Sequence, residues 1–438
     1  MADQQIPSAG PWDTFRQFLS LERDVLVLSI AMFAFSLGFQ MTNRFLPDYL
    51  VFLGATGLVV GLFATLGNAI GAVYPYYGGV VSDRVGSRFA LTAFGFVSVI
   101  GFGIWFASAF IPAIPLGGTE IPPWIWVFFG LLLAQCWKSF GIGGHYAIVK
   151  QSVPPNRLAR GFASTETFRR TAFLIAPILV AVLVADALMP GFLWVLVIAI
   201  VFGLLGTIAQ HFLYRPDADT VGKEFQGFGQ IVDDIKQLPT EHRPLIIADT
   251  LVRFANGMVY VFFILVVTRI MGIGLTVTLP LAGTIDLSPA AFFGVLLAVE
   301  MLIALLSMAP MSIVAERTGL KTVVGLGFVV YAIFPTLLIF APPNQVVLIA
   351  LFAFSGLRFA GLPAHKALIV GPAAMGSGGR VTGSYYFVRG ALVIPSGAVG
   401  GFIWEFASPE LSFTIASIIG TIGVIYYAIY GKEFEAYE

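Results

Sequence analysis

The chain has 438 residues, of which 58% are hydrophobic and only 11% are charged, and its formal net charge is zero. Soluble globular domains carry about 25% charged residues, so this composition predicts a polytopic membrane protein rather than a soluble domain. Zero net charge gives no indication of a nucleic-acid partner. The single cysteine, Cys136, lies in an apolar run, which excludes a disulfide framework and a thiolate metal site.

The polar segment 1–24 lacks the shape of a cleavable signal peptide, so we expect the first apolar helix to act as its own insertion signal. Twelve apolar runs follow, each long enough to cross a bilayer. They lie near 25–46, 57–78, 90–111, 123–149, 161–183, 192–214, 244–268, 289–310, 322–341, 347–370, 382–404 and 411–430. The predicted division is an N-terminal segment (1–24), a six-helix bundle (25–214), a central loop (215–243), a second six-helix bundle (244–430) and a tail (431–438).

The basic residues of the loops favour one orientation. If the N-terminus is cytoplasmic, they concentrate on the cytoplasmic side, and Arg44 and Arg269 alone fall on the outer side. Cytoplasmic loops are enriched in Lys and Arg. We therefore expect a multi-pass protein of the plasma membrane with the N- and C-termini, the central loop and the tail in the cytoplasm.

The two halves of the chain are internally similar. At a constant offset of 220 residues, Lys138, Gly141, His145 and Arg169 correspond to Arg358, Gly361, His365 and Arg389. Earlier in each half the offset is 233, and Gly61, Asp83, Arg84 and Gly86 correspond to Gly294, Glu316, Arg317 and Gly319. Both repeats start on the same side of the membrane, so they are parallel repeats related about the membrane normal.

The stretch GGVVSDRVGSR (78–88) lies on the turn between the second and third helices, and a degenerate copy, SIVAERTGLK (312–321), lies between the eighth and ninth. It closely resembles the G-x-x-x-D-R-x-G-x-[RK] signature of the major facilitator superfamily, and with the twelve helices and the duplication the resemblance covers essentially the whole chain. The resemblance implies an all-α membrane fold of two six-helix repeats and a conformational latch formed by Gly79, Asp83, Arg84, Gly86, Arg88, Glu316, Arg317 and Gly319. Physically, Asp83 can cap a helix end, and Arg84 and Arg88 can pair with carboxylates or lipid phosphates.

Four charged residues, Lys138, Arg253, Glu300 and Arg358, fall near the bilayer centre. Each costs about 2.5–3.5 kcal/mol there on insertion scales, so they must face the bundle interior or water. Asp249, Arg253, Asn256 and Tyr260 lie on one face of the seventh helix, where Asp249 can pair with Arg253.

The positions of these polar residues predict their roles. Transporter sites lie near the midplane between the repeats, which assigns the substrate pathway to Lys138, Arg253, Asn256, Tyr260 and Arg358. The desolvated carboxylate of Glu300 is the first candidate for a proton carrier, followed by Asp249 and Glu166. His145 and His365 are candidate proton relays, although satisfied packing histidines are an equal alternative. Arg169 and Arg389 are predicted to form ion pairs of a gate, and Pro177 and Pro395 to be hinges.

These features predict a secondary active transporter that works by alternating access, is coupled to protons or another ion, and acts as a monomer in the lipid bilayer. No P-loop, metal-ligand cluster or nucleophile–base pair is apparent, so we expect no cofactor, no metal, no catalytic residues and no enzymatic activity. The basic excess at mid-depth favours a small organic anion as substrate. Two alternatives remain: proton-coupled efflux of lipophilic compounds, and a facilitator-fold protein that serves as a sensor or assembly factor without transporting.

Overall fold

The computed structural model describes residues 23–116, 118–140, 158–213, 236, 240–279, 283–370 and 378–433. The first bundle contains α2 (Arg23–Asn43), α3 (Leu46–Phe52), α4 (Gly57–Val85), α5 (Ser87–Ser108), α6 (Trp124–Ala134) with η1 (Cys136–Phe140), α8 (Leu158–Leu183) and α9 (Leu188–Leu213). The second bundle contains η3 (Thr240–His242), α11 (Arg243–Val259), η4 (Tyr260–Phe262), α12 (Phe263–Leu265), η5 (Val266–Met271), α13 (Pro289–Thr318), α14 (Leu320–Ile339), α15 (Gln345–Gly356), η6 (Leu357–Phe359), α16 (Leu362–Val370), α17 (Gly378–Val393), α18 (Ser396–Phe406) and α19 (Pro409–Tyr430).

Within the described residues, ten helical spans are long and apolar enough to cross a membrane. The α6–η1 segment is a shorter apolar span. The twelfth span is α8, a 26-residue helix with Arg169 and Arg170 in its middle. Helices are the expected element because a bilayer offers no water to pair with free backbone groups. The predicted all-α membrane fold, with twelve spans in two parallel six-helix repeats, is thereby confirmed. The predicted segments 1–24, 215–243 and 431–438 fall largely outside the described residues and stay predictions.

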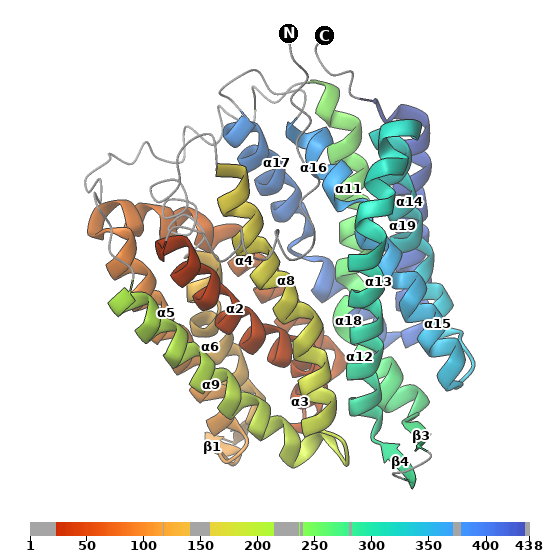
Figure 1. Cartoon of the computed structure of the whole chain (residues 1–438). Helices are drawn as coiled ribbons and strands as arrows, with labels where there is room; N and C mark the ends of the chain where they lie inside the picture. The colour runs from red at the N-terminus through yellow and green to blue at the C-terminus, as the bar shows by residue number, and fades with distance from the viewer. Residues whose placement is uncertain are drawn as a thin grey trace.

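Two short antiparallel hairpins mark one side of the molecule (Figure 1). They are β1 (Ile114–Leu116) with β2 (Thr119–Ile121), and β3 (Leu275–Leu279) with β4 (Gly283–Leu287). We call this end the hairpin side. The first turn of α2 and the last turn of α19 lie at the other end, which we call the terminal side (Figure 1).

Several spans are interrupted where the polar residues lie. Lys138 lies in the π-helical segment η1, Tyr260 opens the 3₁₀ segment η4, and Arg358 lies in the 3₁₀ segment η6. The chain also breaks between α17 and α18, at Pro395, whereas α8 continues through Pro177. Broken helices at membrane depth are tolerated where they line a cavity or are buried in protein, so these interruptions mark the region where a site is to be sought.

The two bundles pack closely on the hairpin side. A Cβ atom added to Gly61 of α4 would lie 2.3 Å from the carbonyl oxygen of Gly397 in α18, so only glycine fits this contact. One turn further along α4, the Thr65 hydroxyl oxygen accepts a hydrogen bond of 2.7 Å from the Ala398 N–H. The backbones of α4 and α18 therefore touch in this half of the membrane.

Three further polar contacts join the bundles on the same side. They run from Gly57 N to Glu405 Oε2 at 2.8 Å, from Arg269 Nε to Asp48 Oδ1 at 2.7 Å, and from Ser288 Oγ to the Val184 carbonyl oxygen at 2.6 Å. One apolar cluster extends through both bundles here and includes Phe45 and Phe293, whose rings meet edge to face at 5.7 Å. The interface is thus closed on the hairpin side.

The repeat is visible in the turns between the second and third spans of each bundle. Gly86 has φ 87° and Gly319 has φ 91°, and these two positions correspond at the offset of 233. Glycine adopts a positive φ without the steric cost that a side chain brings. The glycines of the signature and of its copy therefore have the same conformational role.

Candidate functional site

The first charge cluster surrounds Glu300, in the middle of α13. Its Oε1 accepts hydrogen bonds from Arg358 Nη2 at 2.7 Å and from the Ser355 hydroxyl at 2.5 Å. Arg44, which follows α2 in the first bundle, places Nη2 4.0 Å from Glu300 Oε2, within ion-pairing range but too far for a hydrogen bond. Arg44, Glu300 and Arg358 are 8%, 4% and 2% exposed. The cluster is buried and combines groups from both bundles.

The second cluster surrounds Asp249 of α11, which is completely buried. Its Oδ1 accepts from Arg253 Nε at 3.2 Å, and its Oδ2 accepts from Arg389 Nη1 and from the Tyr385 hydroxyl, both at 3.0 Å. His365 Nε2 lies 3.3 Å from the same Oδ2. The pair predicted within the seventh helix, Asp249 and Arg253, is therefore present, and α16 and α17 complete the cluster.

Tyrosine rings connect the two clusters. The Tyr331 hydroxyl accepts a hydrogen bond of 2.8 Å from Arg253 Nη1, and the same ring has its centroid 5.2 Å from Arg358 Cζ. Tyr260 lies under Arg44, with the guanidinium carbon 3.9 Å from the ring centroid. Guanidinium groups are attracted to the electron-rich faces of aromatic rings. Tyr260 and Tyr331 thus hold the arginines in place without neutralising them.

Among the residues that the structure describes, the two clusters have more cations than anions. Four arginines (Arg44, Arg253, Arg358 and Arg389) face two carboxylates (Glu300 and Asp249). Three buried guanidinium nitrogens, Nη1 and Nη2 of Arg44 and Nε of Arg358, have no hydrogen-bond partner among the described residues. Buried donors without a partner are costly. The arrangement is therefore suited to an incoming acceptor that carries negative charge.

Lys138 contributes a further cation from the first bundle. Its side chain is exposed rather than packed in the core. Its Nζ lies 5.6 Å from the ring centroid of Phe39. An ammonium group facing lipid at this depth would be costly, so we expect it to face the space between the bundles.

The remaining predicted pathway and gate residues fall in different surroundings. Asn256 is half-buried, and its side-chain oxygen has no hydrogen-bond partner among the described residues. Arg169 stacks against Phe173, with Cζ 5.4 Å from the ring centroid, whereas Arg389 joins the Asp249 cluster. His145 and the side chain of Glu166 lie outside the part of the chain that the structure describes. Their roles stay predictions.

The signature turns bind within their own bundles. Arg88 Nε donates to the carbonyl oxygen of His211, in the last turn of α9, at 2.8 Å. In the second bundle Lys321, which corresponds to Arg88, donates from Nζ to the Ala428 carbonyl oxygen of α19 at 3.1 Å. A cation at the C-terminal end of a helix is favourable because carbonyl groups there lack partners. Arg88 thus binds a helix end, where a carboxylate or a lipid phosphate was expected.

The other latch residues are only partly described. Gly79 and Arg84 lie in the last turns of α4, and Arg317 lies in the last turn of α13. The side chains of Asp83 and Glu316 are not among those that the structure describes. A latch role for these residues is therefore still a prediction.

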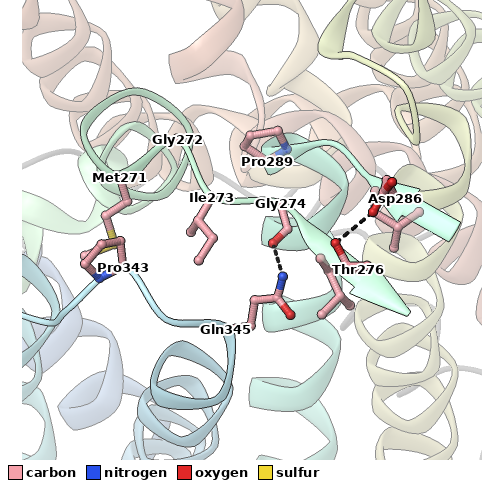
Figure 2. A pocket seen from close by; sticks show the side chains of 11 residues that line it. Met271, Gly272, Ile273, Gly274, Thr276, Asp286, Pro289, Pro343 and Gln345 are labelled. Carbon is pink, nitrogen blue, oxygen red and sulfur yellow. Dashed lines mark hydrogen bonds between the residues drawn. The ribbon is translucent and has the colours of Figure 1, made fainter. Parts of the chain in front are cut away.

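A cavity of about 450 Å³ opens elsewhere, on the hairpin side of the second bundle. Figure 2 shows its polar lining, where Gln345 Nε2 donates to the Gly274 carbonyl oxygen at 3.0 Å and the Thr276 hydroxyl donates to Asp286 at 2.7 Å. None of the intramembrane charges that the structure describes lines this cavity. It is separate from the two charge clusters.

Three residues of the site, Arg44, Ser355 and Tyr331, are not predicted from the sequence. Arg44 has the sequence context of a charge in the outer loop. Tyr385 belongs to a group of tyrosines for which the sequence allows a place in a cavity lining, as well as simple packing between helices. The sequence does contain an indication that Arg44 belongs to the site, since this residue directly follows an apolar helix of 21 residues and comes shortly before Pro47. No comparable signal separates Tyr331 from the many aromatic residues of the chain.

The fold and the site define a polytopic membrane transporter, in which two helical bundles enclose ionic groups. The chain belongs to the major facilitator superfamily, because the sequence model of that family matches residues 28–299. An uncharacterized MFS-type transporter of Methanocaldococcus jannaschii is 24% identical over 403 residues, which are 92% of this chain and 93% of the relative.

Solved structures of other transporters share the fold. A point mutant of the nucleoside transporter NupG superposes with a TM-score of 0.73 at 14% identity, over 93% of this chain and 100% of that one. A POT family transporter in complex with 5-aminolevulinic acid superposes with a TM-score of 0.68 at 14% identity, over 97% of both chains. At these identities the likeness extends to the fold alone.

Proposed function

We propose that this transporter moves a small organic anion together with protons, by alternating access. The observation that carries the proposal is the unpartnered, buried guanidinium nitrogen atoms of Arg44 and Arg358 beside a single carboxylate, Glu300, among the residues that the structure describes. A carboxylate or phosphate ester would supply the missing acceptors, and guanidinium groups bind such planar or multidentate anions well. The solute would then bridge the two bundles, because Arg44 and Arg358 belong to different ones.

Glu300 and Asp249 are the groups that we expect to exchange protons. Each is buried and each contacts arginines, so protonation of either changes the charge balance of its cluster. When Glu300 is protonated, its hold on Arg358 weakens and the guanidinium donors become available to the solute. His365, which contacts both Asp249 Oδ2 and the Tyr385 hydroxyl, is placed to relay a proton to the second cluster.

We further propose that the protein is a monomer in the plasma membrane, with the terminal side in the cytoplasm. The loop charges favour this orientation, and the burial of Arg44 removes one of the two basic residues that the sequence placed on the outer side. On this orientation the closed hairpin side faces outward, and we expect solute to exchange with the cytoplasm in this conformation. The predicted boundaries at 24, 214, 243 and 430 separate the bundles from cytoplasmic segments.

Uptake into proteoliposomes with an imposed pH gradient tests the function. A panel of radiolabelled carboxylates, phosphate esters and lipophilic cations would be offered at one concentration, with and without the gradient. We expect gradient-driven accumulation of a member of the first two classes and a sharp reduction in the Arg358→Gln variant. Transport of lipophilic cations that survives this change would support the efflux alternative, and an absence of flux for every class would support a non-transporting role.

A further inference from the structure

The repeat that relates the bundles fails at one charged position. Helix α4 (Gly57–Val85) matches α13 (Pro289–Thr318) nearly end to end at the offset of 233, and this offset places Gly67 opposite Glu300. The other offset places Lys138 opposite Arg358. The second bundle therefore pairs its cation with an acid at 2.7 Å, whereas the first bundle keeps the cation and has glycine in place of the acid.

Lys138 has no acidic partner among the residues that the structure describes. Within these ranges its ammonium group makes no hydrogen bond or salt bridge, and it lies over the ring of Phe39. An ammonium group at membrane depth without an acidic partner creates a positive potential that an anion would relieve.

The glycines of α4 leave room for such an anion. A Cβ atom added to Gly67 or Gly71 would have no neighbour within 4 Å among the residues that the structure describes. At about 100° per residue, Gly71 lies between Thr65, which contacts α18, and Tyr74, which donates to a carbonyl oxygen of α6. It also lies opposite Val73, which is 45% exposed and, as an apolar side chain, is expected to face the lipid. The open space therefore faces the interior between the bundles rather than the lipid.

We propose that Lys138 binds the anionic group of the solute, and that this group occupies the open space beside Gly67 and Gly71 as the counterpart of the Glu300 carboxylate. The inference rests on the proposed function and names the chemistry at one end of the solute. A carboxylate is the group expected, because it replaces a missing side-chain carboxylate opposite a compact ammonium charge.

Cysteine labelling tests the potential in this space without knowledge of the solute. The chain has one cysteine, Cys136, which is buried, so Cys136→Ala provides a background for Gly71→Cys. Gly71→Cys is reacted separately with two methanethiosulfonate reagents, the anionic sulfonatoethyl and the cationic trimethylammonioethyl compound. Each rate is divided by the rate at which the same reagent reacts with 2-mercaptoethanol in solution, and the two normalised rates are compared. We expect the anionic reagent to be favoured by roughly tenfold, because a positive potential acts on the two reagents in opposite directions.

Three further variants assign the preference to Lys138. Lys138→Gln is expected to abolish the preference for the anionic reagent. Gly67→Glu, which supplies the missing acid, should abolish the preference as well. The neutral variant Gly67→Gln should preserve it. A control cysteine at Thr119, exposed in the β1–β2 hairpin, should show a ratio that Lys138→Gln does not change. The proposal is overturned if neither reagent labels Gly71→Cys, or if its ratio is the same with and without Lys138.

The outcome is separable from that of the proposed function. If the labelling preference is found but no anion is accumulated in proteoliposomes, the transport function fails and the anion site stands. If an anion is accumulated and Lys138→Gln transports it with unchanged KM and rate, the site fails and the function stands.

Discussion

Arg44 Nη2 and Glu300 Oε2 lie 4.0 Å apart across the interface between the bundles, and both side chains are buried. Arg358, by contrast, binds Glu300 from within the same bundle at 2.7 Å. Rotation of one bundle against the other would therefore change the first distance and leave the second nearly intact. We therefore expect the number of cationic partners of Glu300 to change if the two bundles move relative to each other.

The first prediction concerns Glu300→Gln. Glutamine keeps the shape of the side chain but cannot exchange a proton, so uptake driven by a pH gradient should fall by about 100-fold, while exchange of labelled for unlabelled solute should continue. Both are measured in the same proteoliposomes. Glu405→Gln, which alters an acid that binds the Gly57 N–H at the interface, is the matched control and should keep its coupling. Normal gradient-driven uptake by Glu300→Gln would show that the proton is carried elsewhere.

The second prediction concerns Arg44. Arg44→Gln removes a charge and two buried donors, so the KM for the anion should rise by roughly tenfold or more, with Arg44→Lys in between. Tyr260→Phe keeps the ring beneath the guanidinium and should change the KM little, whereas Tyr260→Leu should raise it, since the stacking contributes about 0.5–2 kcal/mol. An unchanged KM in Arg44→Gln would remove Arg44 from the pathway.

The third prediction concerns the stability of the second bundle. Asp249→Asn leaves Arg253 and Arg389 without their carboxylate and should destabilise the protein by about 3 kcal/mol, as the loss of one partner of a buried ion pair does. The thermal unfolding temperature in detergent reports the effect. Adding Arg389→Gln to Asp249→Asn should recover part of the loss, because one uncompensated charge is removed. If the double variant is less stable than Asp249→Asn, the pairing is not the source of the effect.

The fourth prediction concerns the ion pair on the hairpin side. Arg269 is about half exposed, so its pairing with Asp48 contributes only about 0.2–1 kcal/mol to closure. Asp48→Asn should therefore shift the population towards a state open on the hairpin side by no more than about fivefold. Spin-label distances between α4 and α18 would measure the shift. Exchange of the two residues, Asp48→Arg with Arg269→Asp, should restore the original distance distribution.

The fifth prediction concerns the turn before α14. Glu433 accepts hydrogen bonds from the N–H groups of Leu320 and Lys321, both at 2.9 Å, and Gly319 beside it has φ 91°. Gly319→Ala should lower stability by about 1–3 kcal/mol, because φ 91° and ψ 152° are essentially restricted to glycine, in addition to its clash with Glu433. Gly103→Ala, inside α5 with open space around it, is the control and should be neutral or stabilising. Equal effects of the two changes would contradict this explanation.

Part of the site follows from local sequence. Asp249 and Arg253 are four residues apart in an apolar helix, and that spacing alone brings their side chains together. Glu300 and Arg358 were both predicted to lie at mid-depth, and the cost of charge in lipid required them to face inward. Their pairing with each other was not predictable, because it depends on how α13 and η6 pack.

Other parts needed the assembled bundles. Arg44 has the sequence context of a loop residue, and only the contact with Tyr260 and Glu300 of the second bundle shows that it belongs to the site. Tyr331 lies 78 residues from Arg253 in the chain, and nothing in the local pattern indicates that its hydroxyl binds that arginine. Arg389 is predicted to form an ion pair or a gate, and the packing of α17 against α11 decides that Asp249 is its partner.

The class of protein, the number of spans and the duplication could all be read from the chain, because a bilayer forces backbone groups into helices of a set length and a repeated polar pattern is legible without coordinates. The sequence does not indicate which charged residues contact each other. That choice depends on the rotation and depth of each helix, which are set by many weak contacts such as the glycine-mediated approach of α4 to α18. The proposed anion site beside Lys138 depends on sequence and structure together. The internal repeat indicates that glycine replaces the acid in the first bundle, and the structure describes the open space beside that glycine.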